Sequence, residues 1–263
     1  MSANNHDHLV HMANQIALYF EPYPRRVRAL VSDRVVLDST RGRLLFESNH
    51  RPQLYVPVED LDADVLERTG TSTHCPFKGD ASYWSLRAGD RVAENAVWTY
   101  REPLDPAPWL RGYAALYWDR VDAWYEEDDE VRGHLRDPYH RVDARPSSRR
   151  VQIVAGEEVL AESDRPVLLF ETGLPTRAYV PRDDVRAELV PSDKRTHCPY
   201  KGDASYWSPR LEDGTVLTDA IWCYEAEDLL PDGPPAIVGL VAFLHDDVEV
   251  RILEPERETA AVG

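Results

Sequence analysis

Two nearly identical thirteen-residue strings hold the side chains best suited to chemistry. Residues 73–85 read THCPFKGDASYWS and residues 196–208 read THCPYKGDASYWS, so that only Phe77 and Tyr200 differ. Each string places an imidazole, a thiol, an amine, a carboxylate and a phenol close together. Such groups bind anions or carbonyl oxygens and transfer protons, which is the combination that an active site needs.

Lysine is rare in this chain, which makes its positions informative. Three of the 30 basic residues are lysines, and two of these, Lys78 and Lys201, occupy equivalent places in the two strings. An ammonium is more compact than a guanidinium, and its pKa shifts more readily. We therefore expect Lys78 and Lys201 to bind an anionic or carbonyl group of a small molecule.

The other motif side chains are assigned roles around this lysine. His74, Asp80, His197 and Asp203 are the candidate proton carriers, and with the two lysines they make up the predicted catalytic set. Ordinary structural roles stand beside this interpretation: a turn-capping histidine, a buried thiol, an exposed loop ion pair and core aromatic rings. The residues expected to line the pockets are Cys75, Ser82, Tyr83 and Trp84, and in the second string Cys198, Ser205, Tyr206 and Trp207.

Proline and glycine predict the backbone of the motif. Pro76 disfavours helix at the residue before it, and Gly79 supplies conformational freedom three residues later. Residues 75–79 should therefore form a tight loop with Lys78 near its tip. Residues 80–85 should continue as a strand, on which successive side chains point to opposite faces.

The similarity between the two strings extends over most of the chain. Equivalent positions are 123 to 127 residues apart (196 − 73 and 239 − 112), too far for a solenoid unit of about 20–50 residues. We therefore predict two copies of a whole small domain. The predicted divisions are an extension at 1–20, domains at 21–130 and 149–255, a linker at 131–148 and a tail at 256–263.

Short segments rich in β-forming residues predict an all-β fold for each copy. Residues 27–39 contain two apolar runs around Ser32 and Asp33, a hairpin pattern. Residues 248–252 alternate apolar and polar side chains, as a half-buried strand does. The best helix candidate, 7–20, lies outside the repeat. We expect a small barrel or sandwich that occurs twice.

Composition excludes several classes of partner. The chain has 47 acidic and 30 basic residues, a net charge of −17, and such a surface repels nucleic acids and anionic lipids. The longest apolar run, 236–244, is far shorter than the roughly 20 residues that span a bilayer. No secretory signal is recognisable. Cys75, Cys198 and Cys223 fit reduced thiols, so we expect a cytoplasmic protein.

The motif resembles the signature of a bacterial and fungal family known as domain of unknown function 427. Residues 92–98, 117–124 and 178–185 also look like this family, and the resemblance covers both copies. It implies a compact, mostly β domain but no settled activity, although a nucleotidyltransferase label is sometimes attached. Nucleotidyl transfer usually needs carboxylates that hold metal ions. The Asp-x-Asp at residues 62–64 becomes Arg-Ala-Glu at 186–188.

These observations leave three functions open. The first is an enzyme acting on a small metabolite in a pocket lined by the motif. The second is a non-catalytic small-molecule-binding or assembly module, in which the two copies pack as a pseudo-dimer. The third is nucleotidyl transfer. His74 beside Cys75 makes a poor zinc site because adjacent side chains rarely reach one ion, and we predict no metal and no cofactor. Cys75 and Cys198 are alternative nucleophiles.

Overall fold

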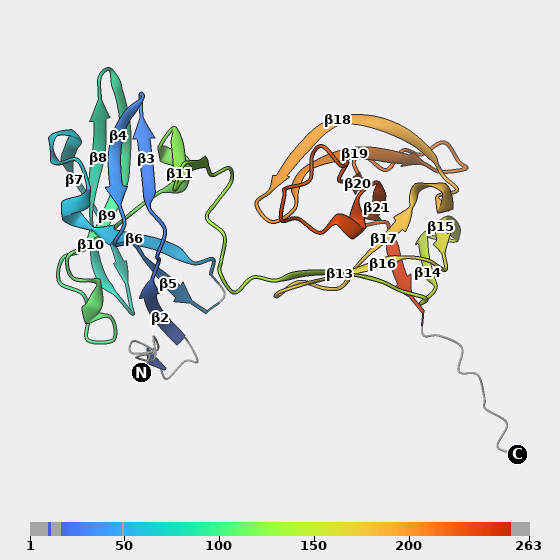
Figure 1. The fold of residues 1–263 in the computed structure, drawn as a ribbon, viewed down its shortest axis with the longest axis horizontal. Coiled ribbons are helices and arrows are strands. Elements are labelled where there is room, and N and C mark those ends of the chain that lie inside the picture. Colours follow the sequence, from blue (N-terminus) through green and yellow to red (C-terminus); the bar gives the residue numbers. More distant parts are fainter. Residues whose placement is uncertain (1–9, 12–16, 49, 254–263) are drawn as a thin grey trace, which may run out of the picture. The chain divides into compact units, whose positions relative to one another are not determined.

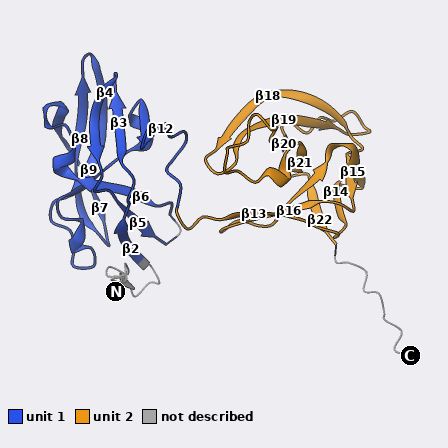
Figure 2. Cartoon of the chain, in the orientation of Figure 1, with its two compact units in different colours: residues 1–137 blue, residues 138–263 orange. Residues whose placement is uncertain are grey.

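A computed structural model describes residues 10–11, 17–48 and 50–253. The chain divides into two compact units, residues 1–137 and residues 138–263 (Figure 2). Antiparallel strands dominate both units (Figure 1), as the sequence predicts. None of the helices in the described ranges has the length and apolarity to cross a membrane. The helical segments described are short 3-10 turns at Val58–Asp60, Ala63–Val65, Pro108–Leu110, Trp118–Arg120, Arg182–Asp184 and Pro235–Ile237.

Unit 1 contains a large sheet and a small one. The large sheet has the spatial order β1 (Val10–His11), β2 (Ala17–Pro22), β5 (Arg43–Glu47), β6 (Gln53–Pro57), β10 (Tyr113–Leu116), β9 (Arg91–Tyr100), β8 (Gly79–Ala88) and β7 (Leu66–Cys75). The small sheet has the order β12 (Asp129–Glu130), β11 (Ala123–Glu126), β3 (Val27–Val31) and β4 (Arg34–Ser39).

Unit 2 repeats this arrangement, except that β1 and β12 have no counterparts among its described residues. Its large sheet has the order β13 (Val142–Pro146), β16 (Val167–Glu171), β17 (Arg177–Pro181), β21 (Leu240–Phe243), β20 (Ile221–Cys223), β19 (Gly202–Arg210) and β18 (Glu188–Cys198). Its small sheet has the order β15 (Glu158–Ser163), β14 (Val151–Ala155) and β22 (Glu249–Ile252).

The two sheets of each unit pack face to face around an apolar core. In unit 1, Val27 and Ala29 of the small sheet share one buried cluster with Val56 and Val97 of the large sheet. Neither strand order closes on itself within the described residues, so the structure is a sandwich and not the barrel alternative. The predicted hairpin is confirmed: Ser32 and Asp33 have positive φ and connect β3 to β4, as a two-residue hairpin turn requires.

One strand near the edge of each large sheet differs from the sequence prediction. Residues 17–20, which the sequence places at the end of a helix and of an extension, instead belong to β2, which pairs with β5. The rest of that helix candidate lies outside the described residues, apart from Val10–His11 in β1. Residues Val142–Pro146, expected in the linker, form β13 and pair with β16. Both strands are so short that an alternation of apolar and polar side chains is not recognisable in the sequence.

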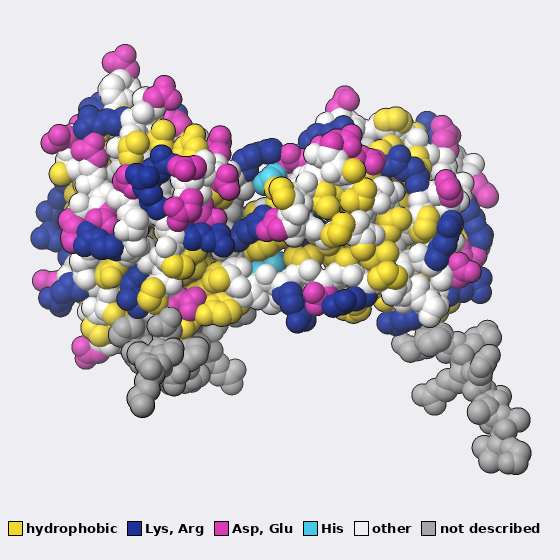
Figure 3. Space-filling model, in the orientation of Figure 1, with side chains coloured by type: hydrophobic (Ala, Val, Ile, Leu, Met, Phe, Trp, Pro, Cys, Tyr) yellow, Lys and Arg dark blue, Asp and Glu magenta, His cyan; other side chains and the backbone are white. Residues whose placement is uncertain are grey.

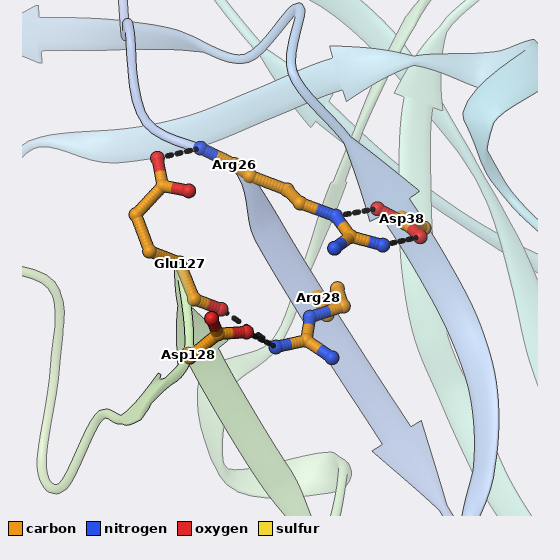
Figure 4. A network of polar contacts seen from close by, with 5 residues as sticks. All are labelled: Arg26, Arg28, Asp38, Glu127 and Asp128. Carbon is orange, nitrogen blue, oxygen red and sulfur yellow. Dashed lines mark hydrogen bonds and ion pairs between the residues drawn. The ribbon is translucent and has the colours of Figure 1, made fainter.

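Arginines hold the acidic run 126–130 at the end of β11. The Arg26 amide donates to the Glu127 carboxylate, and the Arg28 guanidinium donates to the Glu127 carbonyl and the Asp128 carboxylate (Figure 4). Arg26 also pairs with Asp38. Exposed ion pairs of this kind contribute little stability. Acidic and basic side chains are interspersed over the visible face of both units (Figure 3).

Candidate functional site

A three-residue turn carries the motif lysine in each unit. In unit 1, Cys75 of β7 pairs directly with Gly79 of β8, whose φ is +98°. The predicted tight loop is therefore confirmed. The amide of Leu104 donates to the carbonyl of Lys78 at 3.1 Å, and that of Leu230 to the carbonyl of Lys201 at 2.9 Å. The segment after β9 or β20 thus fixes the turn against the unit.

The lysine side chain turns inward and forms a buried ion pair. Lys78 Nζ lies 2.5 Å from Glu47 Oε2, and the two side chains are 11% and 15% exposed. In unit 2, Lys201 Nζ lies 2.6 Å from Glu171 Oε2, with exposures of 9% and 10%. A loop ion pair between Lys78 and Asp80 does not form. Because the pair is buried, replacing one partner by a neutral residue should destabilise the unit, since the other charge is left uncompensated.

Each ion pair lines a cavity with aromatic walls. The cavities have volumes of about 250 Å³ in unit 1 and 430 Å³ in unit 2. Seven lining residues are identical and equivalent in the two units, and in unit 1 they come from four strands of the large sheet and the motif turn. They are Leu45, Glu47, Tyr55, Lys78, Tyr83, Trp98 and Tyr100, and in unit 2 Leu169, Glu171, Tyr179, Lys201, Tyr206, Trp222 and Tyr224.

Hydrogen bonds fix the aromatic walls in matching positions. Trp98 Nε1 donates to the hydroxyl of Tyr55 at 3.3 Å, and Trp222 does the same to Tyr179 at 3.2 Å. The Tyr83 hydroxyl lies 2.9 Å from Thr73 Oγ1, a contact that unit 2 repeats at the same distance. A prearranged set of polar groups is typical of small-molecule sites.

The cavity phenols stay neutral. Burial raises the pKa of Tyr55 and Tyr100 well above the ordinary value, and it does the same to Tyr179 and Tyr224. A neutral phenol donates one hydrogen bond and does not serve as a base near neutral pH. The unit 1 cavity therefore offers an ammonium and several hydroxyl donors against the carboxylate of Glu47, and the unit 2 cavity adds a second carboxylate, Asp219, and a second ammonium, Lys194.

Unit 2 adds a histidine to the ion pair. His140 Nε2 lies 3.0 Å from Glu171 Oε1, and its ring stacks on Tyr200 with centroids 4.1 Å apart. Tyr200 is the one motif residue that differs between the copies. Burial raises the pKa of Glu171, but the hydrogen bonds from Lys201 and His140 outweigh burial and hold that pKa below its ordinary value.

Acidification should weaken unit 2 through Glu171. Because its pKa is lower in the folded protein than in the unfolded chain, its stabilisation is present above the unfolded value, near 4.5, and is lost as pH falls through the folded value. Urea unfolding between pH 6 and pH 3 checks this. The double variant Glu171→Gln with Lys201→Met should lose less stability on acidification than the wild type. Parallel acid limbs for the two proteins would contradict the assignment.

More than half of the predicted site residues lie away from the cavities. His74 Nδ1 lies 2.6 Å from Asp80 Oδ1, and the two side chains are 65% and 77% exposed. They form a cross-strand pair on the face of β8 opposite Tyr83, because neighbouring strand residues alternate. His197 and Asp203 pair likewise at 2.8 Å. The structure therefore does not bring these proton carriers to the lysines.

The remaining motif residues divide between the two faces in the same way. Tyr83 and Tyr206 line the cavities, as does Cys198, and Cys75 packs against the aromatic cluster beside the unit 1 cavity. Ser82 and Trp84 lie on the opposite face of β8, and their equivalents Ser205 and Trp207 are likewise outside the lysine cavity. Of the predicted motif residues, the cavities are therefore lined by the two lysines, by Tyr83 and Tyr206, and by Cys198.

Four aromatic or acidic lining positions that the two units share were not predicted from the sequence. Glu47, Tyr55, Trp98 and Tyr100 come from β5, β6 and β9, which lie far from the motif in the chain. Sheet order brings these strands together, and a local pattern does not reveal it. One signal was available: each of these residues is identical in the other copy, within the flanking segments that repeat.

The rims of the two cavities differ. His50 and Arg51 line the unit 1 cavity where Leu174 and Pro175 line the unit 2 cavity. Unit 2 also has Lys194, whose ammonium lies over the Tyr206 ring. The two cavities therefore share a floor and differ at the rim.

The carboxylates expected for nucleotidyl transfer have other partners. Asp62 accepts hydrogen bonds from the Arg34 side chain at 2.7 Å and from the Asp64 amide at 3.1 Å. In the part of the chain that the structure describes, no three His, Cys, Asp or Glu side chains are grouped closely enough to hold a metal ion.

Comparison with known proteins identifies the family. The family model described as a domain of unknown function (DUF427) matches residues 19–127 and again residues 143–254. The chain belongs to this family and carries its domain twice. Both matches begin inside the strands β2 and β13 that the sequence prediction left out of the two domains. No curated protein matches the chain.

Proposed function

We propose that each unit binds a small, oxygen-rich molecule with a carboxylate or carbonyl group beside its motif lysine. The observation that carries this proposal is the recurrence of one buried Lys–Glu pair in a tyrosine-walled cavity, with seven identical lining residues, in both units. Packing alone would be served as well by an apolar pair of similar volume, since a buried ion pair is weak support for stability.

The donors of the cavity define the chemistry of the ligand. An ammonium has three N–H donors, and Glu47 accepts one from Lys78. The remaining donors and the neutral phenols suit the oxygens of a carboxylate or a ketone, to which charge-assisted hydrogen bonds are strong. In unit 1 the rim residue Arg51 adds a second positive charge. The cavity is thus locally cationic in a chain whose net charge is −17.

We favour binding over catalysis at this site. The exposed His74–Asp80 pair lies on the other face of the sheet, and the raised pKa values leave the buried phenols without a basic form. The small-metabolite enzyme therefore remains the alternative. Nucleotidyl transfer has less support, because Asp62 of the Asp-x-Asp segment is bonded to Arg34. A cytoplasmic location accords with the three free thiols.

A thermal-shift screen separates these functions. Benzoate, pyruvate and phenylpyruvate serve as probes, and benzyl alcohol is the uncharged control. A binding anion at about 100 times its Kd should stabilise its unit by about 2.7 kcal/mol. Binding predicts that the stabilising probe is recovered unchanged by NMR after prolonged incubation. Conversion of the probe would favour the enzyme, and equal shifts with benzyl alcohol would contradict an anion site.

A further inference from the structure

A second cavity lies on the other face of the same sheet in unit 1. It has a volume of about 360 Å³, and its walls include Leu61, Trp84 and Val97 together with Arg101. On β8 and β9 these residues alternate with those of the lysine cavity: Trp84 follows Tyr83, and Val97 precedes Trp98. The two cavities therefore share strands but have no lining residue in common.

Unit 2 covers the equivalent tryptophan with its own side chain. Arg182, which occupies the position of Val58, lies over the Trp207 ring with its guanidinium carbon 4.5 Å from the centroid. The same guanidinium donates to Glu225 at 2.8 Å. Glu225 is the equivalent of Arg101, so unit 2 places an arginine and a glutamate where unit 1 has a valine and an arginine.

The thiol of Cys223 completes this arrangement in unit 2. It donates to the Glu225 carboxylate at 3.1 Å and receives a hydrogen bond from Arg182 at 3.3 Å. The buried position of this thiol corresponds to that of Thr99, which lines the unit 1 cavity. In unit 2, therefore, the charge of Glu225 is paired with Arg182 and hydrogen-bonded by Cys223, all within the unit.

Unit 1 has neither an arginine over its tryptophan ring nor the ion pair between arginine and glutamate that unit 2 has. Val58 is too short to cover Trp84 as Arg182 covers Trp207, and Val58 is itself 39% exposed. Arg101 is exposed and has no hydrogen-bond or ion-pair partner among the described residues. The cavity therefore combines an apolar wall, an aromatic face and one cation without a counter-charge.

We propose that this cavity is a second binding site, specific to unit 1, for an amphipathic monoanion such as an alkyl or aryl carboxylate. The apolar part of the ligand would lie against Trp84, in the place that the Arg182 side chain takes in unit 2. Its carboxylate would pair with Arg101, which replaces the internal Glu225 contact. Burial of the apolar part supplies most of the affinity. The exposed charge pair supplies selectivity for anions.

Displacement of the fluorescent anion anilinonaphthalene sulfonate from the full chain tests the site. Octanoate should displace the dye, and octanol should do so about tenfold less well. The double variant Val58→Arg with Arg101→Glu, which introduces the unit 2 residues, should lower the affinity for octanoate by about tenfold or more. Unchanged octanoate affinity in this variant, with its melting temperature retained, would overturn the proposal.

Two further variants test the contact of Arg101 with the carboxylate and the independence of the two cavities in unit 1. Arg101→Gln changes one exposed side chain, so the fold should be kept, and it should abolish the preference for octanoate over octanol. If the preference survives, Arg101 does not bind the carboxylate and the proposal fails. The variant Glu47→Gln with Lys78→Met alters only the lysine cavity. It should leave octanoate binding intact, so failure at one cavity is distinguished from failure at the other.

Discussion

Replacing Lys78 with methionine should destabilise unit 1 by about 3 kcal/mol, which is the order expected for breaking a buried ion pair. The reason is the position of Glu47, whose carboxylate is 15% exposed and is bonded by no other side chain in the described ranges. Methionine has nearly the volume of lysine, so packing is preserved while the charge of Glu47 loses its partner. Urea unfolding followed by circular dichroism measures the loss.

Two comparisons test this cause. Lys201→Met should cost less than Lys78→Met, because His140 still bonds Glu171 in unit 2. The double variant Glu47→Gln with Lys78→Met should recover most of the lost stability, since a neutral amide replaces the unpaired carboxylate. Equal losses in the single and double variants would mean that packing, and not charge, explains the effect.

Substitution of Gly202 with alanine should destabilise unit 2 by roughly 4 kcal/mol or more, among the largest effects of a single change. Gly202 has φ of +119°, a conformation that side-chain-bearing residues rarely adopt. A Cβ atom there would also collide with the backbone carbonyl of Asp228, which accepts a hydrogen bond from the Asp203 amide. The nearest atoms all belong to the backbone of Asp228 and Leu230, so a change of side-chain rotamer cannot remove the collision.

Gly79 provides a matched control in unit 1. It is the equivalent residue and has φ of +98°, but a Cβ atom there would lie 3.3 Å from the nearest atom, the carbonyl oxygen of Glu102. Gly79→Ala should therefore cost mainly the backbone strain, roughly 2 kcal/mol. Thermal unfolding of both variants checks the order. If Gly79→Ala lost more stability than Gly202→Ala, the collision with the Asp228 carbonyl would not explain the effect at Gly202.

Local patterns predicted the local parts of this fold. The β3–β4 hairpin follows from two apolar runs around Ser32 and Asp33, and the motif turn follows from Pro76 and Gly79. The duplication itself is visible by comparing the chain with itself. Strand β13 was missed because five residues between charged neighbours carry too little pattern, and its partner β16 lies about twenty residues away.

The candidate site was predicted in part for the same reason. Lys78 and Tyr83 could be assigned because the motif is contiguous, whereas Glu47 reaches Lys78 only through the sheet order. His74 and Asp80 were grouped with the lysine on proximity in sequence alone. Strand alternation, which was already apparent from the sequence, places Asp80 and Tyr83 on opposite faces and separates the two sets.

The number of pyruvate molecules bound at saturation tests the central claim most directly, because pyruvate lacks the apolar part that the second cavity of unit 1 would bind. Isothermal titration of the wild type should give about two sites, one in each lysine cavity. The neutral-pair variants, Glu47→Gln with Lys78→Met and Glu171→Gln with Lys201→Met, should each retain one, and the quadruple variant should retain none. His74→Ala, on the opposite face, should leave both. Two sites in a folded quadruple variant would contradict the proposal that the motif lysines bind the ligand.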